Sequence, residues 1–154
     1  MFFTSFSIKG IVYVNVLPPD ETFTGEYFAN NILPHLKVAA NEIKGTISSY
    51  KVPLHMDNAK PHNSIIAQKK MNELHIERLP HPPYSPDISP NDFFLYGYIK
   101  NKLKGNRFAT RNELIDAVVE IIKNIDESTW ISVYDEWIER IKKVIECNGE
   151  YPEF

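Results

Sequence analysis

Two short motifs constrain the fold of this chain more than any other feature. The first, residues 55–62, follows an apolar run and carries Asp57. The second, residues 80–92, has five prolines in its first eleven positions and ends on Asp92. Prolines at this density exclude a helix interior or a central strand, so residues 80–90 are predicted to be an ordered loop. The motifs therefore place one aspartate at a strand end and the other at a helix start.

Two carboxylates on separate rigid elements are typical of a divalent-metal site for phosphoryl transfer. Mg²⁺ usually takes one or two protein carboxylates and completes its octahedron with water and phosphate. The residues alone leave alternatives open. Asp57-Asn58 after a strand is also a common turn. Ser89 and Asp92 also fit the capping pattern of a helix start, where a carboxylate is favoured by the helix dipole.

The spacing of the two motifs resembles the catalytic core of mariner-type transposases. In that family the second catalytic aspartate lies in an H-x-D-N-A-x-x-H segment and the third in Y-S-P-D-L-x-P-x-D, with 34 residues between them. Asp57 matches the second and Asp92 the third, again with 34 residues between them, whereas Asp87 matches a non-catalytic aspartate. The resemblance runs from about residue 1 to residue 150.

The resemblance implies a DDE-superfamily endonuclease with a ribonuclease-H-like domain. It implies DNA transposition and DNA integration of a transposable element, with Asp57 and Asp92 as catalytic residues and ligands of Mg²⁺ or Mn²⁺. It also implies nucleic-acid binding at transposon ends, a location in the nucleus, and a partner that is either a second copy or a full-length transposase subunit.

One departure from the family pattern changes the expected activity. No residue of this chain matches the first catalytic aspartate, because the early acids Asp20 and Glu21 follow the second apolar run and are predicted to be loop or helix-start residues. The basic DNA-recognition region is not matched either. Residues 1–154 are therefore expected to form a single, N-terminally truncated catalytic domain that is inactive alone. The alternatives are a domesticated, non-catalytic DNA- or protein-binding module and a relic without function.

The expected fold class is α/β, a ribonuclease-H-like mixed sheet flanked by helices, lacking the first, central strand and ending in helices. Apolar periodicity predicts strands at 2–8, 11–17, 52–56 and 76–79, and helices at 24–43, 63–74, 89–105, from 110 and from 129. Pro34 should kink or divide its helix, and Gly105 should be the C-cap of the third helix. Thr110 should open the next helix, and Thr129 should cap the last. Without the central strand, the hairpin either keeps an unpaired edge or closes directly onto the strand before Asp57.

Several polar residues are candidates for supporting roles. Asn58 and His62 are expected to hold the metal ligands in place from outside the coordination sphere. Zinc is not favoured, because no cysteine and no regular histidine spacing accompanies His55, His62 and His81. A basic run after Asp92 is a candidate for phosphate contact, or simply a cationic helix end favoured by the dipole: Lys100, Lys102, Lys104 and Arg107.

Composition narrows the class of protein. The net charge is −3, but its distribution is uneven: residues 1–108 carry 12 Lys/Arg against 9 Asp/Glu, and residues 109–154 carry 5 against 11. A DNA backbone would therefore meet the first two-thirds of the chain. The single cysteine, Cys147, excludes an internal disulfide and suits a reducing compartment. No apolar run approaches the roughly 20 residues of a membrane span, so no membrane partner is expected.

Overall fold

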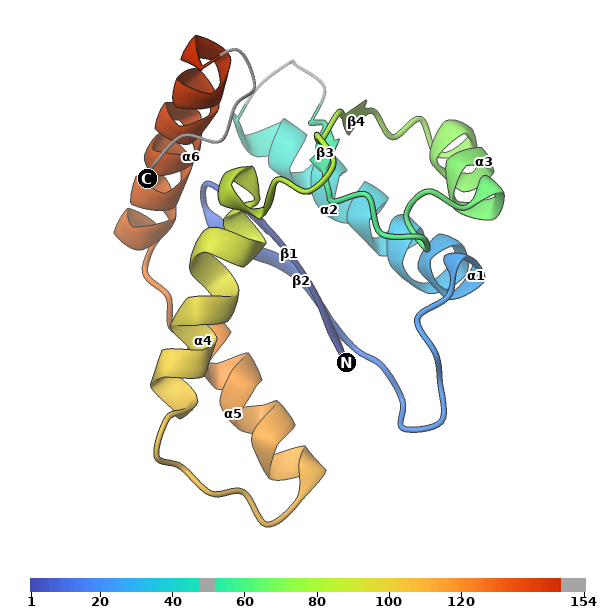
Figure 1. The fold of residues 1–154 in the computed structure, drawn as a ribbon. Coiled ribbons are helices and arrows are strands. Elements are labelled where there is room, and N and C mark those ends of the chain that lie inside the picture. The colour runs from blue at the N-terminus through green and yellow to red at the C-terminus, as the bar shows by residue number, and fades with distance from the viewer. Residues whose placement is uncertain (48–51, 148–154) are drawn as a thin grey trace. The chain divides into compact units, whose positions relative to one another are not determined.

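The computed structural model describes residues 1–47 and 52–147 (Figure 1). The chain folds into two compact units. Unit 1 combines Met1–Ser5 with Val12–Tyr84, and unit 2 combines Phe6–Ile11 with Ser85–Phe154. Helices and short strands alternate in the α/β order that the sequence predicts.

The strands form two separate two-stranded sheets. Strands β1 (Phe2–Ser7) and β2 (Gly10–Val16) are joined by a tight turn, where Gly10 adopts a φ of 123° that favours glycine. Strands β3 (Leu54–His55) and β4 (Arg78–Leu79) pair in parallel. Strands β3 and β4 are both shorter than the predicted strands at 52–56 and 76–79. Among the described residues no strand joins the two sheets. The hairpin therefore keeps an unpaired edge, and the alternative prediction, that it pairs directly with β3, is wrong.

A long helical run follows the hairpin in unit 1. It consists of α1 (Gly25–Tyr27), the π-helical turn η1 (Phe28–Ile32) and α2 (Leu33–Ile47). The Leu33 amide donates to the Phe28 carbonyl five residues earlier. Pro34 has no amide hydrogen and crowds the carbonyl four residues before it. Of the two outcomes predicted for Pro34, division of the helix is wrong, because a wide turn directly before it lets α2 continue; the kink stays a prediction.

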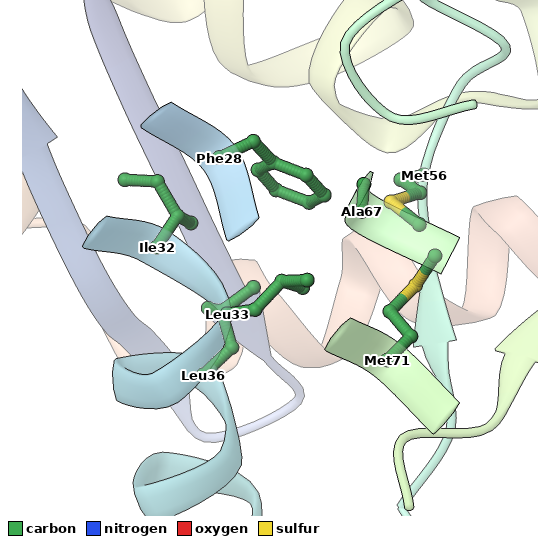
Figure 2. Close-up of a cluster of buried hydrophobic side chains, with 7 residues drawn as sticks. All are labelled: Phe28, Ile32, Leu33, Leu36, Met56, Ala67 and Met71. Carbon is green, nitrogen blue, oxygen red and sulfur yellow. The ribbon is translucent and has the colours of Figure 1, made fainter. Parts of the chain in front are cut away.

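The core of unit 1 lies between this helical run and α3 (Ile65–Glu73). Figure 2 shows the side chains of both helices pointing toward one another, together with a methionine that follows β3. Each of these side chains is almost fully buried, and burial of one large apolar side chain contributes about 1.5–3 kcal/mol. The cluster comprises Phe28, Ile32, Leu33, Leu36, Met56, Ala67 and Met71.

Unit 2 is helical apart from the hairpin tip. Its elements are a 3-10 turn, η2 (Pro86–Ile88), a π-helical turn, η3 (Asn91–Leu95), and helices α4 (Tyr96–Leu103), α5 (Arg111–Lys123) and α6 (Glu127–Glu146). Helices α4 and α5 lie side by side (Figure 1). Leu95, Ile125 and Trp130 form the core. Residues 80–90 are thus not a loop throughout, because η2 interrupts them.

The helix ends test the capping predictions. Thr110 caps α5, since its hydroxyl accepts from the Glu113 amide, and Gly105 follows α4 with a φ of 87°. Thr110 therefore opens α5 as predicted, whereas Lys104 occupies the C-cap position of α4 and Gly105 is the residue after it. The prediction for Thr129 is wrong: α6 begins earlier, and the Asp126 carboxylate caps it by accepting from the Thr129 amide. Within the described residues, no helix has the length and apolar content that a membrane crossing requires.

Candidate metal centre and nucleic-acid interface

Asp57 follows β3 at the start of an irregular loop, and one of its carboxylate oxygens is held by the protein. Asp57 Oδ1 accepts from the Ala59 amide at 3.1 Å and from His62 Nδ1 at 2.7 Å. The side chain is 53% exposed, and in the described part of the chain Oδ2 forms no hydrogen bond or ion pair. The turn and the metal-ligand interpretations therefore coexist: Oδ1 anchors the carboxylate, and Oδ2 remains free to bind a cation.

His62 is buried against aromatic rings, which fixes its orientation. Its ring centroid lies 4.7 Å from that of Phe28, 5.8 Å from Phe23 and 6.4 Å from Phe3. Because a carboxylate oxygen can only accept, Nδ1 must carry the proton that it donates to Asp57. The opposite ring atom, Nε2, is buried and has no hydrogen-bond partner among the described residues. The aromatic pocket thus directs one nitrogen toward Asp57.

These contacts change the acidity of Asp57. The hydrogen bond from His62 holds the pKa of the Asp57 carboxyl below its ordinary value, and the Ala59 amide acts in the same direction. Partial burial opposes both contacts by disfavouring the charged form. Asp57 is therefore ionised at neutral pH, which is the state that a divalent cation requires.

Arg78 on β4 ties the Asp57 loop to the parallel sheet. Its guanidinium donates to the Asp57 carbonyl at 2.9 Å, to Asn58 Oδ1 at 3.2 Å and to Asn63 Oδ1 at 2.5 Å. The Asn58 amide also donates to the His81 carbonyl at 2.7 Å. The side chain of Asn58 thus bridges two loops, and its role here is to hold the backbone around Asp57.

A pair of histidines lies beside the same loop. His55 Nε2 and His81 Nδ1 are 3.1 Å apart, so one of them donates a hydrogen bond to the other. Burial and the neighbouring His81 and Arg78 lower the pKa of His55 to about 4. His55 is therefore neutral at neutral pH. Among the described residues no group of three or more histidine, cysteine, aspartate or glutamate side chains could hold a metal ion.

Asp92 lies in unit 2, on the π-helical turn η3, whereas Asp57 lies in unit 1. The turn opens with the Ser89 carbonyl, which accepts from the amides of Asp92 and Phe93 at 2.9 and 3.0 Å. The Asp92 side chain is exposed, and within the described ranges it makes no hydrogen bond or ion pair. It is therefore not a capping partner. Asp87, in contrast, is buried.

The loop before Asp92 is anchored to α6. The Trp137 indole donates to the Ile88 carbonyl at 2.8 Å, and the Arg140 guanidinium donates to the Asp87 carbonyl at 3.1 Å. Arg140 also lies 4.4 Å over the ring of Phe93. The turn that carries Asp92 is therefore fixed at both ends. The residues before it are bound by α6, and the residues after it continue directly into α4.

The four basic candidates gather at the end of α4. Two lie in its last turn, one is its C-cap and one lies in the following loop, and all four are exposed. Lys102 also lies 5.5 Å over the ring of Tyr98. Within the described residues none of the four forms an ion pair, so their charges are available to phosphates: Lys100, Lys102, Lys104 and Arg107.

Known proteins resemble this chain over nearly its whole length. It is 34% identical over 151 residues to human histone-lysine N-methyltransferase SETMAR, an alignment that covers 94% of this chain and 21% of SETMAR. It is 27% identical over 155 residues to the Mariner Mos1 transposase of Drosophila mauritiana, covering 94% of this chain and 42% of Mos1. This chain is a relative of the mariner transposases.

The fold agrees with this relationship. The mariner-related chain superimposes on the crystal structure of the Mos1 catalytic domain with a TM-score of 0.86, at 23% identity, covering 99% of this chain and 75% of that one. Its fold is therefore ribonuclease-H-like, as predicted. A comparison with protein-family models finds no match. The chain spans about a fifth of SETMAR and less than half of Mos1.

Arg78 and Asn63 are the positioning residues that the sequence reasoning missed in this mariner-related chain. Arg78 reaches the Asp57 loop only because β4 lies parallel to β3, with Arg78 opposite Leu54. A sequence pattern gives strand positions but not their pairing. The available signal was a pair of charged residues, Glu77 and Arg78, between Ile76 and Leu79 in a predicted strand that leads into the proline segment.

Proposed function

We propose that this chain is a transposase-derived nucleic-acid-binding domain that binds Mg²⁺ or Mn²⁺ weakly through Asp57 and Asp92. The observation that carries the proposal is the Asp57 carboxylate, anchored through Oδ1 with Oδ2 free. Two carboxylates suit Mg²⁺, which takes few protein oxygens and keeps several waters. The Mos1 catalytic domain has been solved with Mg and with Mn.

The proposal assigns separate tasks to the residues of the chain. Asp57 and Asp92 would hold the cation, which would stabilise charge on the phosphoryl oxygens. His62 keeps the Asp57 carboxylate ionised and directed, and Arg78 fixes the loop backbone. Solved structures include a Mos1 transposase paired-end complex with left transposon end. This supports DNA as the partner, with the basic end of α4 contacting phosphates.

We further propose that these 154 residues do not cleave DNA by themselves. No residue matches the family's first catalytic aspartate, and among the described residues no cluster of three acidic or imidazole groups could hold metal. Misplacing a reacting group by about 1 Å can cost on the order of 10²-fold in rate. Nicking of plasmid DNA by the purified chain in Mg²⁺ or Mn²⁺, abolished by Asp57→Asn, would overturn this part of the proposal.

DNA binding is tested by fluorescence anisotropy on a labelled duplex over a range of salt. Binding should weaken with salt, with a slope of about −0.9 per phosphate contact. Replacing the four basic residues at the end of α4 by Gln should make the salt dependence less steep, by the amount expected for the loss of up to about four phosphate contacts. The control replaces three exposed lysines elsewhere, Lys9, Lys69 and Lys123. Equal losses in both variants would contradict a specific basic interface.

The second candidate function is a non-catalytic binding module, favoured by the lack of a third metal-binding group among the described residues. A chelator separates the two functions. The non-catalytic module is the better description if two results are obtained. EDTA should leave the DNA affinity unchanged, and calorimetry should detect no Mn²⁺ binding that depends on Asp57, as judged by comparison with Asp57→Asn. Both functions imply a location in the nucleus, which a fluorescent fusion in cells would test.

A further inference from the structure

Tyr84 is the most exposed large apolar side chain among the described residues. It is 99% exposed, so both faces of its ring are open to solvent. In the described part of the chain the ring has no aromatic neighbour, and its hydroxyl forms no hydrogen bond. Single exposed apolar residues are common and need no explanation by themselves. Tyr84 differs from them because its backbone is also unusual.

The backbone of Tyr84 has a φ of 54°, in the left-handed region. Pro83 and Tyr84 lie in a turn. A turn with proline at its second position and a positive φ at its third normally has glycine or asparagine there, because a larger side chain crowds the backbone. The turn alone would therefore favour glycine at position 84. A bulky residue in this conformation stores strain, and stored strain is typical of places where a side chain binds a ligand.

The segment that carries Tyr84 is stiff. Four prolines lie between residues 79 and 87, and each fixes its own φ. The His81 carbonyl accepts from the Asn58 amide group at 2.7 Å, and the His81 ring shares a hydrogen bond with His55. A rigid segment therefore presents the tyrosine ring, and binding a ligand on this ring costs little conformational entropy.

The same contacts place Tyr84 close to the Asp57 loop. His81 is hydrogen-bonded to the residue that follows Asp57, and the three residues of chain from His81 to Tyr84 span at most about 11 Å. The sequence has no acidic side chain at positions 79–86, and the next one, Asp87, is buried. A DNA strand with a phosphate at Asp57 can therefore reach the ring without meeting an exposed carboxylate of this segment.

We propose that Tyr84 is a stacking platform for an unpaired nucleobase next to the phosphate at Asp57. The proposal rests on the proposed function and specifies the form of the DNA. Bases within a duplex are covered by their neighbours, whereas a base in a single-stranded extension is free to lie on the ring. Every base has a flat face, so the contact carries little sequence preference.

A protein partner would require a different surface around the ring. Aromatic anchors of protein interfaces lie at the centre of a wider contact area that excludes water. No other exposed large apolar residue of the described chain lies within ten residues of Tyr84 in the sequence. A single flat ring, open on both faces and beside a phosphate-binding loop, fits a nucleobase better than a protein surface.

Fluorescence anisotropy at one salt concentration compares a blunt duplex with the same duplex carrying a short single-stranded extension on one strand or the other. The wild type should bind an extended probe about 5–100-fold more tightly, from the stacking of one base. Tyr84→Leu keeps apolar area without a flat ring and should lose this preference, whereas the matched variant Tyr84→Phe should keep it. Tyr84→Gly should also lose it, yet unfold at an equal or higher urea concentration, because glycine relieves the strained φ.

The base analogue 2-aminopurine, placed in the extension, reports the contact directly, because its fluorescence falls on stacking. The wild type and Tyr84→Phe should quench it, and Tyr84→Leu should not. Equal binding of both probes by the wild type, a preference that survives in Tyr84→Leu, or unchanged fluorescence would overturn the proposal. Blunt duplex should bind equally to all four proteins, so its binding without a preference removes only the stacking role. A wild type that binds neither probe would overturn the proposed function as well.

Discussion

Replacing His62 by phenylalanine should separate the function of the Asp57 site from the stability of the fold. The phenyl ring can fill the pocket that Phe3, Phe23 and Phe28 form around the imidazole. It cannot donate to the Asp57 carboxylate, which now receives that bond at 2.7 Å. We expect the Asp57 pKa to rise toward its ordinary value and the affinity for Mn²⁺ to fall by roughly 10–100-fold.

The expected change in stability is small because two effects oppose each other. Loss of the hydrogen bond to a half-exposed carboxylate costs about 1 kcal/mol, since water can replace the donor. Removal of the buried, unpaired Nε2 atom of His62 stabilises the fold by about 1–3 kcal/mol, because that atom no longer has to be desolvated. The net change in the free energy of unfolding should stay within about 1–2 kcal/mol of zero. His62→Ala should instead destabilise by about 2–4 kcal/mol, because it leaves a cavity.

Three measurements on His62→Phe, His62→Ala and the wild type check this reasoning. NMR titration of the Asp57 carboxyl carbon follows its pKa, urea unfolding follows stability, and calorimetry follows Mn²⁺ binding. The lowered pKa of Asp57 stabilises the folded state above the ordinary pKa, and that stability is lost as pH falls through the folded value. Phenylalanine should reduce this acid-dependent loss. An unchanged Asp57 pKa in His62→Phe would refute the role assigned to His62.

Three further predictions concern the surroundings of the site. His55 has a folded pKa of about 4, below its ordinary 6.5, so its stabilising contribution is present above pH 6.5 and is lost as pH falls toward 4. Unfolding should become easier by on the order of 1–2 kcal/mol over that window, reduced by the partial exposure of the ring, and His55→Gln should flatten the profile. Gly25→Ala should destabilise by about 1–3 kcal/mol, because its new methyl group would collide with the Ser64 hydroxyl that caps α3, and Ser64→Gly should recover part of that loss in urea unfolding. Trp137→Phe should cost about 1–2 kcal/mol, because the Ile88 carbonyl loses its donor, and hydrogen exchange should accelerate in η2.

Local chemistry explains which parts of the fold could be predicted from sequence. Thr110 and Gly105 were predictable because a hydroxyl cap and a left-handed glycine act within one turn. The error at Thr129 has the same local basis: Asp126, Ser128 and Thr129 are all cap formers, and the carboxylate wins because it accepts from both Ser128 and Thr129. The wide turn before Pro34 depends on how a whole helix packs, and short-range patterns do not report that.

The residues of the candidate site also divide into those that local sequence suggests and those that only the tertiary structure reveals. Motif spacing and the family resemblance made Asp57 and Asp92 candidates, and adjacency suggested Asn58 and His62; the role of all four in metal binding stays a prediction. Arg78 required knowledge of strand pairing. The aromatic pocket around His62 combines Phe3, Phe23 and Phe28, which are distant from it in sequence. The donors that hold the Asp57 carboxylate in place thus come from tertiary structure, while the candidate carboxylate itself is visible in the sequence.

The π-helical turn at residues 91–95 gives Asp92 an orientation that an ordinary helix would not allow. A π turn contains one residue more than an α-helical turn, and each helical residue rotates the chain by about 100°. Deleting a single residue from this turn would restore regular helix and rotate Asp92 by about that angle relative to the basic end of α4. The helix could remain folded and buried as before, yet its carboxylate would point away from its present direction. A deletion here would therefore redirect the carboxylate that is proposed to hold the cation while the helix persists, a change that screens for folded protein would miss.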